Sequence, residues 1–292
     1  MLINFKEYLQ SDDWSDNMRS FIMFGFIVSL AAFSSHLVAQ NFDHSIFDEL
    51  LKTHVKNGLV DYQALKVNQV KLTEYLKQLE QVAFDQFDQW SKDEQMVFWI
   101  NAYNAITIEG ILRNYPIQWG GLITRARFPQ NSIRQISGFW DKVFIKVMGK
   151  NVTLNDIEHK ILRKEFGDPR IHFVIVCASI GCPIWESQAF FSSDLKQRLD
   201  QATRNFINDP AKVRLDRQQN ILFLSSIFDW YKEDFSASAD GMKQFDNYSK
   251  AEIGVIEIVM KYVSEAEQND IVQQQPKLKY LDYDWSLNEQ KK

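Results

Sequence analysis

Apolar and polar positions follow a helical period in the first part of the chain beyond residue 40. Apolar side chains recur every three or four positions over residues 41–56, and again over residues 70–82. This spacing predicts two amphipathic helices, each with one face against a core. Between them, residues 58–62 begin with a glycine and predict a turn that leads into a short extended stretch.

Residues 92–114 predict a third helix, which is apolar on nearly every side. Ser91 precedes it and Glu94 follows three positions later, which is the spacing of a capping box at a helix N-terminus. Pro116 ends the pattern. A helix without a polar face is buried, so we expect the rest of the domain to pack around these residues.

Beyond residue 120 the pattern changes to short extended stretches mixed with helices. We expect an irregular basic loop over 120–138, a strand over 143–148 that turns at 149–151 and resumes at 152–154, and a helix capped by Asn155 that runs to about Glu165. Apolar, β-branched positions fill residues 171–177 and predict a strand covered on both faces. A tight loop over residues 178–183 follows.

The last third of the chain mixes helices and strands in the same way. The predicted elements are a helix over 194–207, a hairpin of 213–215 with 221–224, a short helix from Ser226 through Phe235 with Asp229 completing a capping box, a helix within 241–263, and an edge strand at 280–285. This mixture predicts one α+β domain over residues 40–292, with helices packed on a small, mostly antiparallel sheet.

The N-terminus has the layout of a signal peptide. Residues 21–33 are apolar and uncharged, Arg19 precedes them, and Ala39 supplies a small residue for cleavage. Met18 begins a conventional leader, so we interpret the acidic residues before it as a start-site misassignment. Residues 1–39 are then an extension and leader, and the mature protein is periplasmic or extracellular. An uncleaved membrane anchor is the alternative, and we expect membrane contact only through this segment.

Composition and missing motifs exclude several functions. The formal net charge is −5, so no strong positive field exists to hold nucleic acid. The sequence lacks the motifs of nucleotide kinases, dinucleotide oxidoreductases, zinc proteases, lipase-like serine hydrolases and EF-hands. No Cys/His spacing is typical of a zinc site, so we expect neither a metal nor another cofactor. The expected partner is a small molecule or a peptide.

The loop after the predicted strand 171–177 is the first candidate for chemistry. Cys177 ends that strand, where a thiolate could be exposed. Side chains five positions apart in a regular strand point to opposite faces, so His172 should not be a direct base for Cys177. His159 is then the better partner, and His172 is interpreted as a hydrogen-bonded core histidine.

Three states of the two cysteines remain open at this point. In an exported protein, Cys177 and Cys182 can form a disulfide across the short loop. A free nucleophilic thiol at Cys177 and a pair of inert thiols are the alternatives. Arg170 and Ser179, which flank Cys177, are candidate binding residues.

Two amides stand inside the apolar helix 92–114. Burying Asn101 or Asn104 without a partner would cost about 1–3 kcal/mol on mutational scales, so each must bond to something. They either tether a loop backbone or form the polar floor of a pocket. Tyr103, which lies between them, is a further candidate binding residue.

A second polar group lies on the helix that begins near Asn155. His159 and Arg163 share one face at four-residue spacing, and Glu158 lies in the first turn, where the helix dipole stabilises its charge. These residues form either a solvated face or the rim of a cleft beside the cysteine loop. Asp234 is a candidate third polar member of such a site.

Five segments together resemble the domain of unknown function 547 family. They are FWINAYNA (98–105), LNDIEHKILR (154–163), DPRIHFVIVCASIGCP (168–183), LSSIFDWYKEDF (224–235) and YDWSLN (283–288). They follow the expected order and cover about residues 84–288. The resemblance implies an exported bacterial protein and brings no settled reaction.

Residues 101–117 are more remotely similar to the helix of transglutaminase-like proteins, which a Cys opens. Asn101 stands where that Cys would be, and His172 would fill the histidine role. The similarity implies a transglutaminase-like fold whose nucleophile is missing or has moved to Cys177. It says little about function.

Two functions follow from these observations. One is a cell-envelope binding module with a polar site around the Cys177 loop. The other is a thiol-dependent hydrolase or acyl transferase, with Cys177 as nucleophile and His159 or His172 as base. In the enzyme, Asn101 or Asn104 would orient the base or an oxyanion.

Overall fold

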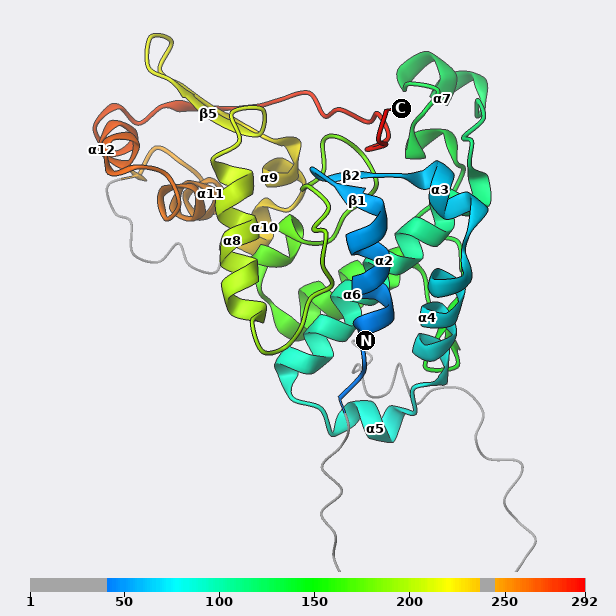
Figure 1. The fold of residues 1–292 in the computed structure, drawn as a ribbon. Helices are drawn as coiled ribbons and strands as arrows, with labels where there is room; N and C mark the ends of the chain where they lie inside the picture. Colours follow the sequence, from blue (N-terminus) through cyan, green and yellow to red (C-terminus); the bar gives the residue numbers. More distant parts are fainter. Residues whose placement is uncertain (1–40, 237–244, 292) are drawn as a thin grey trace, which may run out of the picture.

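The longest helix runs through the middle of the molecule. In the computed structural model, which describes residues 41–236 and 245–291, helix α6 spans Lys92–Asn114. Ser91 and Glu94 form the predicted capping box, since each side chain accepts a hydrogen bond from the backbone N–H of the other. Most side chains of α6 are buried, so the other elements pack around it (Figure 1).

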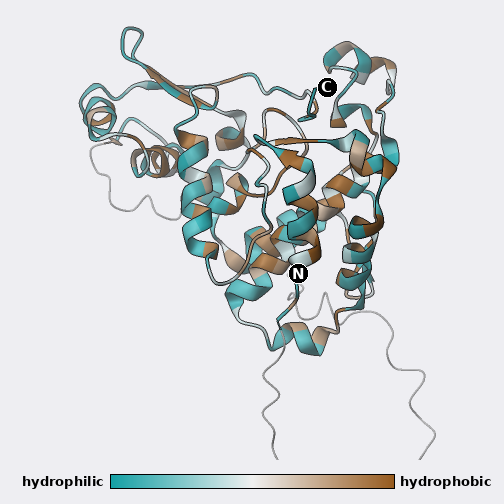
Figure 2. Cartoon of the chain, viewed as in Figure 1, coloured by the Kyte–Doolittle hydropathy of each residue, from teal (hydrophilic) through white to brown (hydrophobic). Residues whose placement is uncertain are grey.

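Four shorter helices and a β-hairpin on the N-terminal side pack near α6. They are α2 (Ser45–His54), the hairpin β1 (Val55–Lys56) with β2 (Leu59–Val60), α3 (Tyr62–Val67), α4 (Val70–Gln81) and α5 (Phe84–Asp88). Helices α2 and α4 confirm the prediction from apolar spacing, and the hairpin confirms the turn and extended stretch. Figure 2 shows hydrophobic and hydrophilic residues side by side on these helices, as expected of amphipathic helices.

Residues 115–168, which follow α6, contain several short elements and one longer helix. They are α7 (Leu122–Arg127), the 3₁₀-helix η1 (Ile133–Gln135), the hairpin β3 (Lys146–Val147) with β4 (Lys150–Asn151), and the longer π-helix η2 (Asp156–Phe166). The irregular loop predicted over residues 120–138 is wrong in part, because it contains α7 and η1. The strand predicted over 143–148 is reduced to two residues.

The strand predicted over residues 171–177 is wrong. The 3₁₀-helix η3 (Pro169–Phe173) occupies its first half, and the chain is irregular from there to Cys177. The segment is largely buried as expected, but its backbone pairs with the amide of Asn104 on α6. A continuous apolar run indicates burial and does not by itself distinguish a strand from other buried backbone. His172 and Cys177 therefore do not lie on opposite faces of a strand.

The C-terminal part combines helices with a three-stranded sheet. Its elements are α8 (Leu195–Ile207), β5 (Val213–Asp216), β6 (Ile221–Leu224), α9 (Ser226–Trp230), α10 (Lys232–Phe235), α11 (Lys250–Met260), α12 (Glu265–Gln274) and β7 (Lys277–Tyr280). Strand β6 pairs antiparallel with β5 and parallel with β7. The helix over 194–207, the hairpin and the helix within 241–263 are confirmed, whereas the short helix predicted from Ser226 through Phe235 is divided at Tyr231 into α9 and α10. Ser225 rather than Ser226 caps α9, so the capping box predicted for Ser226 and Asp229 is not formed. Strand β7 ends at Tyr280, so the edge strand predicted at 280–285 is wrong beyond its first residue.

Two apolar clusters form the core of this α+β protein. The larger surrounds α6 and contains Phe98 and Trp99, and the smaller includes Phe228, on α9, and Val255, on α11. Phe173, at the end of η3, belongs to the smaller cluster although its neighbours in the chain belong to the larger one. The segment that carries His172 and Cys177 therefore lies where the two clusters meet.

The end of the chain crosses over the cysteine loop. Residues 281–291 run from β7 towards α7 (Figure 1). Ile180 N–H donates to Ser286 O at 2.8 Å, and Gly181 N–H donates to Asp284 O at 2.7 Å. These bonds fix the last residues against the loop that holds both cysteines.

The leader predicted over residues 1–39 lies outside the described residues, so export and cleavage after Ala39 stay predictions. Within residues 41–236 and 245–291, no helix is both long enough and apolar enough to cross a bilayer. The domain boundaries at residues 40 and 292 likewise stay predictions.

Candidate functional site

A pocket of about 450 Å³ opens beside the cysteine loop. Five of the candidates identified in the sequence line it: Tyr103, Glu158, His159, His172 and Cys177. They come from α6, η2 and the segment that begins with η3. Residues between 128 and 140, in and next to α9 and in the C-terminal segment also line the pocket. The volume lies within the range of pockets that bind small molecules.

A chain of polar contacts connects the two histidines of the pocket. His172 Nε2 lies 2.6 Å from Asp234 Oδ2. Arg163 donates to both oxygens of the same carboxylate, from Nε at 2.6 Å and from Nη2 at 2.7 Å. Its Nη1 lies 2.8 Å from Nδ1 of His159. Asp234 thus belongs to the polar group, as the sequence suggests, although it does not itself line the pocket.

These contacts determine which ring nitrogens carry protons. A carboxylate only accepts, so in the neutral ring Nε2 of His172 carries the proton and Nδ1 keeps a lone pair. A guanidinium only donates, so Nδ1 of His159 accepts and its Nε2 carries the proton. Within the described part of the chain, neither of these remaining nitrogens has a hydrogen-bond partner. In their neutral forms the two rings therefore offer one imidazole acceptor and one imidazole donor to the pocket.

Asp234 keeps its charge in this environment. Burial alone would raise the pKa of Asp234, but the hydrogen bonds from His172 and Arg163 outweigh it and hold the pKa well below its usual range. The same hydrogen bonds from the guanidinium to Asp234 raise the pKa of Arg163. Tyr231 stacks on His172 with ring centroids 3.9 Å apart, which holds the imidazole plane in place.

Glu158 is buried in the pocket wall, with 4% of its surface exposed. Tyr103 O–H donates to its Oε2 at 3.0 Å, whereas Oε1 has no hydrogen-bond partner among the described residues. Burial and, after it, the charge of Glu158 raise the pKa of Tyr103, so this hydroxyl stays a donor. A solvated position for Glu158 is therefore wrong. Buried polar atoms normally have partners, so Oε1 is a place where a donor from water or a ligand would bind.

Aromatic rings and one arginine form the exposed side of the pocket. The guanidinium of Arg134 lies over Phe128, Trp140 and Trp285, at 4.8, 5.7 and 5.0 Å from their ring centroids. Trp285 also stacks on Trp230 at 5.6 Å. Arg134 is exposed and forms no ion pair with any residue in the described ranges. It therefore presents an uncompensated positive charge at the opening.

Cys177 and Cys182 form a disulfide in the pocket wall, with their Cα atoms 6.3 Å apart. Of the three states open from the sequence, this is the one that the structure adopts, and neither residue is a free cysteine. Ser179 is buried within the loop, with its hydroxyl 3.2 Å from Cys177 Sγ, and it does not line the pocket. Cys177 could therefore act as a nucleophile only after reduction.

Tyr283 lines the pocket beside this disulfide. Its O–H donates to Cys182 Sγ at 3.0 Å. The ring lies directly against Gly181, where a Cβ atom would come within 2.7 Å of it. Glycine at this position therefore permits the close approach of the C-terminal segment to the loop.

Asn101 and Asn104 tether backbone rather than line the pocket. Asn101 donates to Phe190 O at 2.9 Å and accepts from Phe190 N–H at 3.0 Å. Asn104 donates to Val174 O and accepts from Val176 N–H, both at 3.0 Å. These contacts confirm the predicted tethers. Neither amide lines the pocket, so the alternative of a polar floor is not supported.

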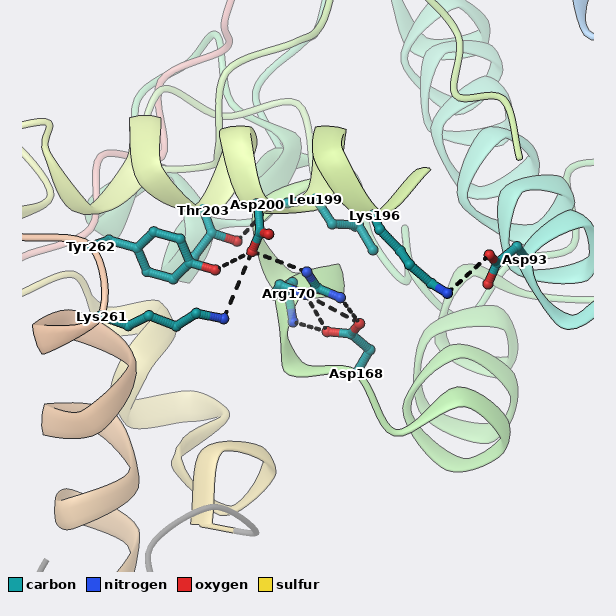
Figure 3. Close-up of polar contacts among 9 residues, drawn as sticks. All are labelled: Asp93, Asp168, Arg170, Lys196, Leu199, Asp200, Thr203, Lys261 and Tyr262. Atoms are coloured by element: carbon teal, nitrogen blue, oxygen red, sulfur yellow. Dashed lines mark hydrogen bonds and ion pairs between the residues drawn. The ribbon is translucent and has the colours of Figure 1, made fainter. Parts of the chain in front are cut away.

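Arg170 lies outside the pocket, contrary to its place among the binding candidates. Its guanidinium bonds to Asp168 at 2.6 Å and to Asp200 at 3.1 Å, and Asp200 also contacts Tyr262 and Lys261 (Figure 3). The network joins η3 to α8 and to the end of α11. Arg170 therefore has its charge satisfied by carboxylates in the fold.

Sequence reasoning does not identify several residues of the pocket. Arg134 lies in the stretch predicted as an irregular basic loop, and Tyr231 lies within the short helix predicted from Ser226 through Phe235. Asn155, predicted as a helix cap, makes no capping bond and lines the pocket instead. The available signal is the aromatic content of the motifs at 224–235 and 283–288, because aromatic residues favour both cores and binding sites.

Comparison with known proteins gives a family match over part of the chain. Residues 87–207 match the model of a family described as a protein of unknown function, DUF547. This match agrees with the resemblance predicted from the motifs at 98–105, 154–163 and 168–183, which lie within it. No curated protein and no solved structure matches the chain, so the transglutaminase-like resemblance stays a prediction. Among the described residues, no group of three His, Cys, Asp or Glu could hold a metal ion.

Proposed function

We propose that the chain is a binding protein whose pocket takes a small zwitterionic ligand, such as an amino acid or a short peptide, with its amino group at Glu158. The observation that carries the proposal is the unpaired Oε1 of this buried carboxylate in the pocket wall. Hydrogen bonds between charged partners are about twice as strong as neutral ones. An ammonium group would supply the missing donor and the opposite charge.

The opposite end of the ligand would meet Arg134. This guanidinium is exposed at the pocket and unpaired within the described residues, and three aromatic rings hold it in place. A planar guanidinium pairs well with a carboxylate. Glu158 and Arg134, neither of which forms an ion pair among the described residues, have opposite charges, which favours a ligand that carries both. The aromatic side chains of the pocket suit a ligand that is apolar between its two charged groups.

We further propose that this binding takes place outside the cytoplasm. The leader pattern of residues 21–33 and the cleavage position at Ala39 support export. The Cys177–Cys182 disulfide supports it as well, because such bonds persist mainly in oxidising compartments.

A matched set of ligands tests the charge requirement by isothermal titration calorimetry. The set is a dipeptide with two apolar side chains, its C-terminal amide and its N-acetyl derivative. We expect the dipeptide to bind, the amide to bind more weakly because it lacks the carboxylate for Arg134, and the acetylated form to bind weakest. Equal affinity of all three, or no binding by any, would contradict the proposal.

The variant Glu158→Gln tests the residue that carries the proposal. The amide can still accept from Tyr103, so the fold is retained while the charge is removed. Loss of one hydrogen bond to a charged group is worth about 1.5–3 kcal/mol, so dipeptide affinity should fall tenfold or more. Glu165→Gln is the control, because Glu165 lies exposed on the same helix.

A thiol-dependent hydrolase is the second candidate, and one observation favours it. His172 lines the same pocket as Cys177, and its Nδ1 has no described partner. In the reduced protein this nitrogen could accept the thiol proton, with Asp234 orienting the ring. Hydrolysis of nitrophenyl esters in reducing buffer tests it, with Cys177→Ala and His172→Gln as variants. Activity that survives both substitutions would exclude this mechanism.

A further inference from the structure

The two sulfur atoms of the disulfide are not equivalent. Both cysteines line the pocket, but Cys177 is half-buried whereas Cys182 is only 3% exposed. A thiolate attacks a disulfide along the line of the S–S bond and must reach one sulfur directly. The exposure therefore favours attack on Cys177 from the pocket, with Cys182 as the leaving group.

The surroundings of Cys182 also suit a leaving group. Its Sγ accepts hydrogen bonds from the Cys177 backbone N–H and from Tyr283 O–H, each at 3.0 Å, and the Ser179 hydroxyl lies 3.9 Å away. Sγ of Cys177 has the Ser179 hydroxyl at 3.2 Å and the Tyr283 hydroxyl at 3.3 Å. The single Tyr283 proton lies nearer Cys182, and only Cys182 receives a backbone N–H. Negative charge is therefore stabilised more at Cys182.

The hydroxyl of Tyr283 can donate a hydrogen bond both before and after the S–S bond breaks. Burial raises the pKa of Tyr283, so its hydroxyl stays protonated at neutral pH. Close packing against Gly181 and ring contacts with Trp230 and Trp285 fix the phenol over the sulfurs. A thiol with a lowered pKa leaves faster in exchange, so these donors act on the rate as well as on the equilibrium.

We propose that the Cys177–Cys182 disulfide is a site of thiol–disulfide exchange, at which a small thiol that enters the pocket attacks Cys177 and displaces Cys182. The incoming thiolate forms a new S–S bond with Cys177 Sγ, and the electron pair of the broken bond goes to Cys182 Sγ. A second thiolate then attacks the incoming sulfur and releases Cys177. In sum, two thiols become a disulfide, and the protein disulfide gains two electrons and two protons.

Site-specific trapping in the wild-type protein tests the direction of attack. The folded protein is treated with 2-mercaptoethanol, which lacks the charges of the proposed ligand, and then quenched with acid. Free thiols are alkylated, and tandem mass spectrometry locates the adduct. We expect the mixed disulfide on Cys177 and the alkyl group on Cys182. An adduct on Cys182, equal labelling of both, or reaction only in denaturant would overturn the proposal.

The variant Tyr283→Phe tests the leaving-group donor. The phenyl ring keeps the packing and removes only the hydroxyl, so we expect reduction by 2-mercaptoethanol to slow roughly tenfold, as for loss of one hydrogen bond to a charged sulfur. Tyr280→Phe is the control, because Tyr280 lies on β7 with no hydrogen bond to either sulfur. An unchanged rate in Tyr283→Phe would contradict the role of Tyr283. These tests do not depend on whether a zwitterion binds.

Discussion

Asn104 joins helix α6 to the backbone beside the pocket through both ends of its amide. Replacing it by leucine leaves Val174 C=O and Val176 N–H buried without partners, at about 1–3 kcal/mol each. We expect Asn104→Leu to lower the melting temperature by at least about 5 °C, since 1 kcal/mol corresponds to roughly 2–4 °C in a chain of this size. Thermal unfolding followed by circular dichroism measures it.

Asn114→Leu is the matched control for this substitution. Asn114 ends the same helix, is half-buried and bonds only to Gly110 O within α6. Its replacement should shift the melting temperature by much less. Equal shifts in the two variants would show that the bonds of Asn104 are not what stabilises the pocket segment.

Asp234 should make stability depend on acid pH. Because its pKa is held well below the usual value near 3.9, its stabilising contribution is present above about pH 4 and is lost as pH falls through the folded-state pKa. We expect Asp234→Asn to melt below wild type at pH 7, and the difference to shrink below pH 4. Asp229→Asn, at a more exposed ion pair, should show no such convergence. A difference independent of pH would contradict this.

At the scale of elements, helix α10 is positioned by its packing against α11. A Cβ at Gly254 of α11 would overlap the carbonyl of Phe235, so α10 could not keep its place. Since α10 carries Asp234, we expect Gly254→Ala to disturb the His172 contact as well as to destabilise the fold by about 1–3 kcal/mol.

The His172 ring signals in NMR spectra and the melting temperature measure both effects of Gly254→Ala. Gly121→Ala is the control, because nothing lies within 4 Å of a Cβ there. If Gly254→Ala melts like this control with unchanged histidine signals, α10 does not depend on that contact.

The elements also show where sequence reasoning succeeds. Helix α6 agrees with its prediction at both ends, because a capping box and a proline are local signals that need no tertiary partner. The segment 171–177 fails, because the amide of Asn104, about 70 positions earlier, satisfies backbone groups that a strand would otherwise pair. Local patterns cannot contain that information.

At the scale of the whole molecule, the candidate site depends on contacts between distant parts of the chain. Glu158 and His172 lie inside the family-matched residues 87–207, whereas Asp234 and Tyr283 lie outside them. The sequence therefore identifies most of the polar residues of the site individually. Their contacts with one another and the aromatic wall of the pocket depend on tertiary packing. The presence of His172 and Cys177 in the wall of one pocket is the clearest example.

The same dependence predicts that residues 87–207 are not an independent folding unit. Isolated, they would expose the faces of α6 that α3 and α4 contact, together with the apolar side chains of α8 that belong to the second cluster. We expect a fragment of residues 87–207 to show no cooperative thermal transition, whereas residues 41–292 unfold in one. A cooperative transition in the fragment would show that it folds without its surroundings.

The proposed binding of a ligand's amino group by Glu158 is tested most directly with two ligands and two proteins. Calorimetry gives the affinities of the dipeptide and its N-acetyl form for wild type and for Glu158→Gln. We predict that acetylation lowers affinity at least tenfold in wild type and has little effect in the variant, because the partner of the ammonium group is gone. An equal loss on acetylation in both proteins would contradict the claim.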